Sequence, residues 1–359
     1  MTTSTDNDSS RSAPVVTVVI PAYNSARYIS DTLDSVLDQS FTDYEVIVVN
    51  DGSSDREELE RIINAHPLPV TYISQENKGV SAARNAAIKV ARGEFYAQLD
   101  ADDQWTPDYL DVQLGILKAN PDVTLVYPNA TIISEDMSGG LEFMKVSPSE
   151  GEANFESLVR QKCVVMTCVT ARMAAIREVG MFDESIRSCE DFDLWLRIVK
   201  NGGRIIYHRD RLVLYRRHEG SLSSDRVWMV RNLLNVLEKC AATFELTPAE
   251  KEILNEQITD NRAMLSLFEG KHALTAGKTA TARASFEKAN EHLHQPKLSA
   301  VIFLLRYAPG LVSLAYAARE RLLARQPDHQ LTGIDKPRTP SSSEIAAEPA
   351  NSNVFTESH

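Results

Sequence analysis

Three carboxylates follow one short apolar run. Phe95 to Leu99 comes after Gly93 and reads as a buried strand, and Asp100, Asp102 and Asp103 follow it directly. Side chains two residues apart in an extended chain share a face, so Asp100 and Asp102 can point the same way. Two such carboxylates repel each other unless a cation lies between them, and hard oxygen ligands suit Mg²⁺ or Mn²⁺. The pattern predicts a divalent cation site.

The same aspartates have a simpler interpretation, because aspartate is common in turns and at helix N-caps. Asp103 precedes Thr106-Pro107, which reads as a helix start. On local grounds both interpretations stay open.

A second acidic group occurs at Glu190, Asp191 and Asp193. Apolar residues recur from there at helical spacing, and the pattern stops at Asn201-Gly-Gly203. Asp191 at a helix start can be an N-cap, or a carboxylate placed to take a proton. Asp193 points in a different direction on a helix, so we expect a structural role for it.

The elements that must position these groups alternate along the first part of the chain. We expect strands at 15–20, 44–49, 70–74 and 95–99, and helices at 25–39, 55–65 and 79–92. Such alternation predicts a parallel sheet with right-handed crossovers, which binds ligands beyond the carboxyl ends of its strands. Pro21, Ala22, Tyr23, Asp51 and the three aspartates all fall at that edge.

The pattern changes later in the chain. A helix at 109–117, a strand at 123–133, a flexible loop at 134–155 and strands at 204–207 and 211–215 are expected. Helices follow from about 225. Those at 265–276 and 279–293 form either a generic hairpin or a unit similar to a tetratricopeptide repeat. Residues 297–325 are apolar and basic. They read as a membrane-surface helix or as one packed on the catalytic domain.

Composition bounds the class of protein. The 359 residues are 43% hydrophobic and carry a formal net charge of -12, which excludes general nucleic-acid binding. The four cysteines have no metal-ligand spacing and are expected to be reduced thiols of a cytoplasmic protein. We expect no signal peptide and no membrane span. The expected parts are a disordered stretch at 1–14, a domain at 15–225, a helical region at 226–325 and a disordered tail at 326–359.

Five motifs together carry a family resemblance: Val18–Asn24, Val49–Asp55, Asn77–Asn85, Leu99–Asp103 and Glu190–Leu196. They resemble the family-2 glycosyltransferases, over roughly residues 15 to 225. The resemblance implies an α/β fold of the GT-A type, with a Rossmann-like, mostly parallel central sheet flanked by helices. The all-helical C-terminal region lies outside it.

The resemblance also implies roles for individual residues. Residues that bind the nucleotide-sugar donor would be Pro21, Ala22, Tyr23, Asp51, Lys78, Arg84, Asp100 and Arg217. Asp102 would bind Mn²⁺ or Mg²⁺, and so would His218, in a loop with Ser221 to Ser223 that closes over the diphosphate. Asp191 would be the catalytic base, with Glu190, Asp103 and Trp195 on the acceptor side or supporting the site.

The implied activity is inverting transfer of a sugar, UDP-linked by expectation, to a hydroxyl on a glycan, a lipid-linked sugar or a protein. Peripheral contact with the inner face of the plasma membrane through residues 297–325, and a homo-oligomer, are compatible with the sequence. Two alternatives stay open. A sugar-nucleotidyltransferase would need a Gly-rich phosphate loop after the first strand, and Pro21–Asn24 is not one. A non-catalytic binding module would not need Asp102 and Asp191.

Overall fold

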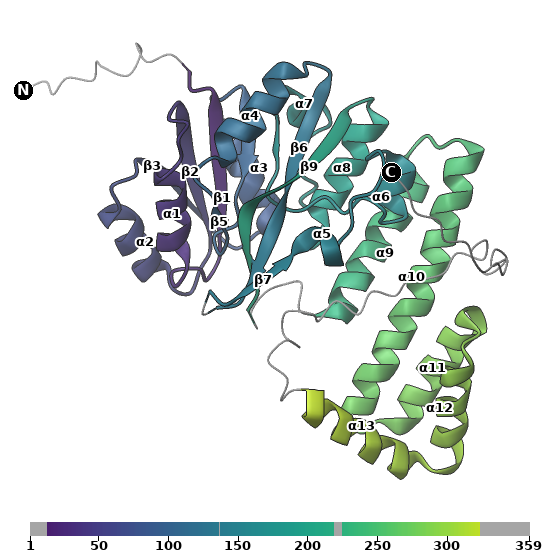
Figure 1. Ribbon diagram of the computed structural model, residues 1–359. Coiled ribbons are helices and arrows are strands. Elements are labelled where there is room, and N and C mark those ends of the chain that lie inside the picture. Colours follow the sequence, from purple (N-terminus) through teal and green to yellow (C-terminus); the bar gives the residue numbers. More distant parts are fainter. Residues whose placement is uncertain (1–12, 136, 219–224, 324–359) are drawn as a thin grey trace, which may run out of the picture.

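The computed structural model describes residues 13–135, 137–218 and 225–323 (Figure 1). The expectations for most of the N-terminal stretch, for the whole tail at 326–359 and for Ser221 to Ser223 concern positions outside these ranges.

One curled sheet dominates the fold, and within the described residues it has nine strands. The spatial order is β3-β2-β1-β4-β8-β6-β9-β5, with β7 beside β6. The strands β3, β2, β1 and β4 are parallel, as are β6 and β9, whereas β8 runs antiparallel to both β4 and β6. Their bounds are β1 Val16–Ala22, β2 Tyr44–Asp51, β3 Val70–Gln75, β4 Phe95–Gln98, β5 Gln104–Trp105, β6 Val123–Ile133, β7 Gly139–Glu142, β8 Thr170–Arg172 and β9 Arg204–Arg216.

Helices flank this sheet and continue beyond it. Helix α3 packs on β1, β2 and β3, and α4 packs on β6 and β8. The bounds are α1 Ile29–Leu37, α2 Arg56–Ala65, α3 Val80–Val90, α4 Tyr109–Ala119, α5 Phe143–Val146, α6 Phe155–Val159, α7 Met173–Glu178, α8 Glu190–Lys200, α9 Arg226–Thr243, α10 Pro248–Thr275, α11 Thr279–Leu293, α12 Pro296–Tyr307 and α13 Pro309–Leu323. The α/β class, a central sheet flanked by helices, and the helical C-terminal region are confirmed.

The parallel half explains why the polar motifs share one edge. Strand β1 is a β-branched run buried almost throughout, and β2 and β4 pair with its two sides. Ala22 pairs with Asn50, and Val19 pairs with Gln98, so the ends of β1, β2 and β4 lie side by side. Gly93 is required at the entry to β4, because a Cβ there would lie 2.5 Å from the Thr17 amide nitrogen.

Three local predictions were wrong. The first helix begins at Ile29 and not at Ser25, because residues 26–28 form a turn closed by the Tyr28 amide on the Ser25 carbonyl. The expected loop at 134–155 contains β7 and α5. The two expected strands after residue 204 are the single strand β9, which pairs with β6 through several register shifts.

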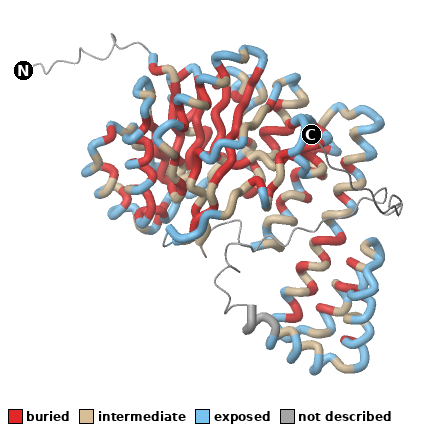
Figure 2. Tube along the Cα trace, in the orientation of Figure 1, coloured by how far each residue is buried: buried red, intermediate tan, exposed pale blue. Residues whose placement is uncertain are grey.

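The C-terminal helices contribute to two hydrophobic cores. Leu234, Val236 and Leu237 of α9, with Leu254 and Ile258 of α10, belong to the core that surrounds the sheet. A second cluster, Ala273, Leu274, Ala282, Phe286, Ala289, Leu298 and Leu305, joins α10, α11 and α12. Buried residues therefore follow the strands and continue along α10 into the second cluster (Figure 2).

The predicted helical hairpin is present as α10 and α11, with the Phe286 ring lying against Gly270, where a Cβ would approach it to 2.5 Å. Helices α12 and α13 pack on this hairpin and on each other. The interpretation that residues 297–325 pack on the sheet domain is therefore wrong for the described part of that segment. Within the described residues, no helix combines the length and the apolar character needed to cross a membrane.

Candidate active site

The turn after β4 is fixed from two sides. The Asp103 amide donates to the Asp100 carbonyl at 3.1 Å, which closes the turn. The Thr32 hydroxyl of α1 lies 3.0 Å from the Ala101 carbonyl oxygen and 2.9 Å from that of Asp103. The aspartate side chains therefore project from a backbone held by the neighbouring helix.

Arg84 joins the two acidic groups of the sequence. Its guanidinium donates through Nη2 to Asp100 at 2.9 Å and through Nη1 to Glu190, and its side chain is 2% exposed. Its Cζ also lies 5.3 Å from the centre of the Phe182 ring. Burial alone would lower the pKa of Arg84, but the Asp100 and Glu190 carboxylates raise it above its ordinary value. Arg84 is therefore a buried bridge between the two acidic groups.

Asp102 and His218 form the second feature of the site. The His218 Nε2 lies 3.0 Å from Asp102 Oδ2, and the His218 ring lies over Tyr28 with centroids 5.0 Å apart. A carboxylate oxygen and an imidazole nitrogen are both donor types that Mn²⁺ or Mg²⁺ would accept. Among the described residues there is no group of three or more metal-binding side chains. Asp102 and His218 therefore present one carboxylate oxygen and one imidazole nitrogen, in contact with each other, beside the turn after β4.

Arg216, at the end of β9, holds the acidic turn and was missed by the sequence reasoning. Its amide donates to Asp103 Oδ1 and its Nε to the Asp102 carbonyl, both at 2.9 Å. Its Nη2 pairs with Asp31 at 3.0 Å, and its side chain is buried. The sequence signal was the basic run after β9, but nothing in that run distinguishes the buried Arg216 from Arg217.

Asp103 is a supporting residue. It is 1% exposed, and its second oxygen lies 3.8 Å from the Cys168 sulfur. Burial, then Asp102 and Asp100, raise the pKa of Asp103 well above its ordinary value. Burial likewise raises the pKa of Asp100, and Arg84 opposes that shift.

Helix α8 presents the second acidic group. Its N-cap is Cys189, which has a left-handed φ of 62° and makes no side-chain capping bond. Asp191 is therefore not the N-cap, and it lies in the first turn beside Glu190. Burial, followed by the charge of Glu190, raises the pKa of Asp191 to about 7. A partly buried carboxylate with a pKa near neutrality is suited to accept a proton.

Of the other predicted site residues, some lie at the carboxyl edge of the sheet and one lies in the hydrophobic core. Tyr23 follows β1 and is 55% exposed. Asp51 is buried and accepts hydrogen bonds from Gln75 and from the amides of Lys78 and Gly79. The Lys78 side chain is exposed. Trp195 belongs to α8, and its buried side chain packs that helix into the main core.

Solved structures share the fold of this chain. TarS 1–349 of S. aureus in complex with UDP-GlcNAc is similar with a TM-score of 0.56 and 21% identity, covering 84% of this chain and 89% of that one. A mannosyltransferase of Pyrobaculum calidifontis in complex with GDP-Man and Mn²⁺ has a TM-score of 0.56 and 23% identity, covering 88% and 89%. These likenesses establish the fold, which is that of GT-A glycosyltransferases.

Sequence comparison gives the family. Residues 17–178 match the family described as Glycosyl transferase family 2. An uncharacterised glycosyltransferase of Rickettsia typhi is 30% identical over 217 residues, which are 59% of this chain and 67% of that protein. The chain belongs to glycosyltransferase family 2.

Other relatives are matched over different shares of their length. A protein of Bacillus subtilis, described as putative teichuronic acid biosynthesis glycosyltransferase TuaG, is 27% identical over 256 residues, 68% of this chain and 98% of that one. The chain spans only about a third of three further Rickettsia glycosyltransferases that it matches.

Proposed function

We propose that the protein transfers a sugar, with inversion, from a UDP-linked donor to a hydroxyl group during cell-surface polysaccharide synthesis. The observation that carries the proposal is Arg84, because its ion pairs bring the acidic turn after β4 and the acidic start of α8 into one site. The similarity to TuaG, described as a teichuronic acid biosynthesis glycosyltransferase, supports a polysaccharide product, and the UDP-GlcNAc complex of TarS supports a uridine nucleotide.

The donor lies, in this proposal, across the edge formed by β1 and β2. The exposed Tyr23 ring stacks on the base, next to the backbone of Pro21 and Ala22. Asp51 still has acceptor capacity for a base or ribose group, because its Oδ2 accepts a single hydrogen bond, from Gly79, among the described residues. Lys78 and Arg217 supply positive charge for the diphosphate.

Asp102 and His218 would hold Mn²⁺ or Mg²⁺, and the bound ion would offset the charge of the leaving nucleotide. Asp100 lies beside them and contacts the ribose or the ion. Asp191 accepts the proton of the acceptor hydroxyl while the hydroxyl oxygen attacks the anomeric carbon of the donor sugar. The attack comes from the side opposite the diphosphate, so the configuration inverts. Arg84 fixes Glu190 next to that base.

The test is release of nucleoside diphosphate from a panel of nucleotide sugars, with Mn²⁺ and with a chelator. We expect metal-dependent release that rises with a hydroxyl acceptor. Formation of a nucleotide sugar from a sugar phosphate and a nucleoside triphosphate would instead support the nucleotidyltransferase. Thermal stabilisation by a nucleotide sugar without turnover would support the binding module. Either result would overturn the proposal.

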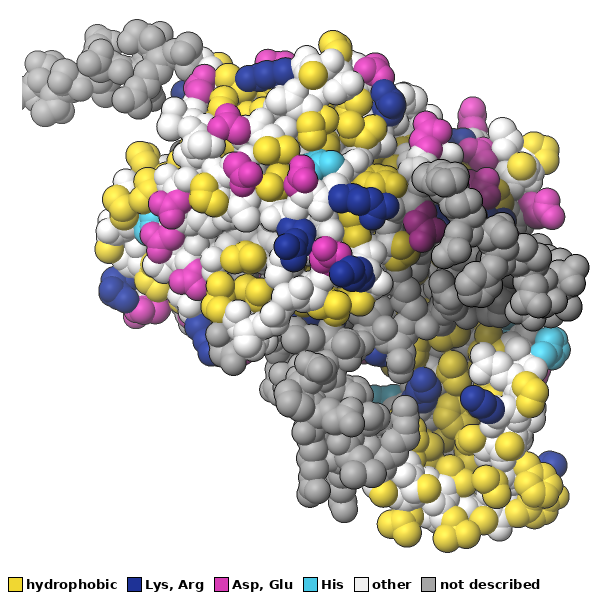
Figure 3. Space-filling view, viewed as in Figure 1, with side chains coloured by type: hydrophobic (Ala, Val, Ile, Leu, Met, Phe, Trp, Pro, Cys, Tyr) yellow, Lys and Arg dark blue, Asp and Glu magenta, His cyan; other side chains and the backbone are white. Residues whose placement is uncertain are grey.

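A membrane contact completes the proposal. Five large hydrophobic side chains on α12 and α13 are between 49% and 70% exposed: Phe303, Leu304, Tyr307, Leu311 and Leu314. Hydrophobic side chains gather over these helices in the space-filling view, at the lower end of the molecule (Figure 3). Lys297 and Arg306 of α12 are exposed, and no ion pair joins them to another described residue. Apolar and aromatic side chains beside unpaired cations suit an anionic bilayer, whereas a second copy of this surface would bring like charges together.

Sedimentation with vesicles tests this contact. The protein is expected to bind vesicles containing phosphatidylglycerol and not those of phosphatidylcholine alone. Phe303→Ser with Leu311→Ser should abolish binding, and Lys297→Glu should weaken it by roughly 1 kcal/mol or more. Val90→Ser and Lys251→Glu, at exposed positions elsewhere, are the controls. A dimer in solution that the double variant dissociates, without vesicle binding, would overturn the membrane assignment.

A further inference from the structure

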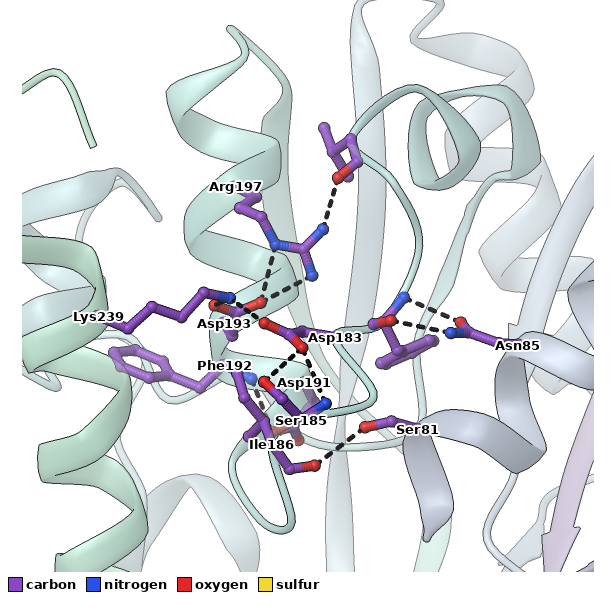
Figure 4. Close-up of polar contacts among 12 residues, drawn as sticks. Ser81, Asn85, Asp183, Ser185, Ile186, Asp191, Phe192, Asp193, Arg197 and Lys239 are labelled. Atoms are coloured by element: carbon purple, nitrogen blue, oxygen red, sulfur yellow. Dashed lines mark hydrogen bonds and ion pairs between the residues drawn. The ribbon is translucent and has the colours of Figure 1, made fainter. Parts of the chain in front are cut away.

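Lys239 connects the C-terminal helices to the element that carries Asp191. It lies in α9, beyond the residues matched by the family. Its Nζ donates to Asp193 Oδ1 and to Asp183 Oδ2, each at 2.6 Å. Figure 4 shows Lys239 reaching these two carboxylates from the neighbouring helix.

Asp193 needs this contact because it has no access to solvent. Its side chain is 0% exposed, and a buried carboxylate requires compensating charge and hydrogen bonds. Arg197, one turn on in α8, donates through Nε to Asp193 Oδ2 at 2.8 Å and also holds the Val179 carbonyl. Lys239 occupies the other oxygen, so each oxygen of Asp193 has a cationic partner.

Asp183 is the second anchor, in the loop between α7 and α8. Its Oδ1 accepts from the amide and hydroxyl of Ser185, and its Oδ2 accepts from Lys239. The preceding residue, Phe182, exchanges two backbone hydrogen bonds with the Asn85 side chain. Hydrogen bonding to Lys239 holds the pKa of Asp183 at about 2 against the opposing effect of burial. One ammonium group therefore fixes both the loop before α8 and the first turn of α8.

We propose that Lys239 is a positioning residue for the transfer reaction, holding the first turn of α8 so that Asp191 faces the acceptor hydroxyl. The strained Cys189, with its left-handed backbone, lies between the two anchors. Strain at that position persists only where the surroundings hold it, and Lys239 supplies part of the restraint. This inference rests on the proposed role of Asp191, and it makes α9 part of the catalytic unit.

The test is Lys239→Met compared with Lys200→Met. Lys200 is a matched control, because it also joins α8 to a C-terminal helix through a half-buried ion pair, with Glu250 at 2.9 Å, but at the other end of α8. Lys239→Met is expected to lower kcat about tenfold to a hundredfold with little change in the donor KM, as small displacements of a catalytic group do. Removal of a cation should also move the acidic limb of the kcat profile to higher pH. Lys239→Arg should recover most of kcat.

Amide hydrogen exchange gives a readout that does not need turnover. Residues 183–193 are expected to exchange faster in Lys239→Met than in Lys200→Met or the unaltered protein. If Lys239→Met exchanges faster but the unaltered protein transfers no sugar, the proposed function would be overturned, while the role of Lys239 in holding residues 183–193 would stand. An unchanged pH profile with unchanged exchange in Lys239→Met, or equal losses of kcat in both variants, would overturn the role of Lys239.

Discussion

The acidic turn after β4 and the acidic start of α8 are built alike and neutralised differently. One carboxylate of each group pairs with Arg84: Asp100 in the turn and Glu190 in α8. Each group also has one fully buried carboxylate, which is Asp103 in the turn and Asp193 in α8. Asp193 lies between two cations, whereas Asp103 is held by an amide and a thiol. The buried carboxylate of the turn after β4 therefore lacks the two ion pairs that Asp193 has, and the Arg216 guanidinium contacts the backbone of this turn instead. In the proposed function a divalent ion would add positive charge at this turn, whereas the start of α8 already has Arg197 and Lys239.

Removing the bridge between the two groups should have the largest effect. Arg84→Met leaves Asp100 and Glu190 without their shared cation in a buried place, so the free energy of unfolding is expected to fall by about 3–5 kcal/mol. Urea unfolding measures it. Arg61→Met breaks an exposed pair with Glu58 and should cost no more than about 1 kcal/mol. An equal fall in the free energy of unfolding in both variants would show that the Arg84 bridge stabilises the protein no more than a surface ion pair does.

Asp191→Asn tests the start of α8 alone. The amide cannot take the acceptor proton, so kcat should fall by about 10³-fold while donor affinity stays the same. Steady-state kinetics and a donor titration separate the two quantities. Asp193→Asn should instead lower stability more than it alters the chemistry. Full turnover in Asp191→Asn would remove the base assignment.

Asp102→Asn tests the turn after β4 alone. Turnover should fall by about 100-fold or more, because ion stabilisation of the leaving group is worth several kcal/mol. After treatment with a chelator, excess Mn²⁺ should restore the turnover of the unaltered protein but not that of this variant. Asp34→Asn is a control, since Asp34 also meets a histidine, His66, at 3.2 Å but far along the chain from the turn. Turnover that is indifferent to a chelator would contradict the metal assignment.

The smallest expected effect is on the pH dependence of kcat and of stability, which reports on Asp191 in α8. The pKa of Asp191 is raised to about 7, so below that pH kcat should fall by about tenfold per pH unit as the base becomes protonated. The same raised pKa favours the protonated folded state. Its contribution to stability is present at low pH and is lost as pH rises through about 7. Asp191→Asn should remove this part of the pH dependence of unfolding, and an unchanged slope would contradict it.

The sequence predicted the parallel half of the fold well, because consecutive strands there pair with near neighbours and share one buried pattern. It did not predict that β8 lies antiparallel between β4 and β6, since that pairing joins segments far apart in the chain. The acidic motifs were visible as short local patterns. Arg216 and Lys239 were not, because their roles depend on partners 113 and 46 residues away. Arg84 was noticed, but its burial between two carboxylates needed the structure.

Helix α10 affects how the protein unfolds locally. Its 28 residues form one ladder of backbone hydrogen bonds that begins in the main core and ends in the second cluster. At a rise of 1.5 Å per residue it extends for about 42 Å. The second cluster is small, so it should unfold as a separate cooperative unit, at a lower free energy than the sheet. Protection of amides against hydrogen exchange should then decline along a single helix, from strong near Leu254 to weak near Leu274.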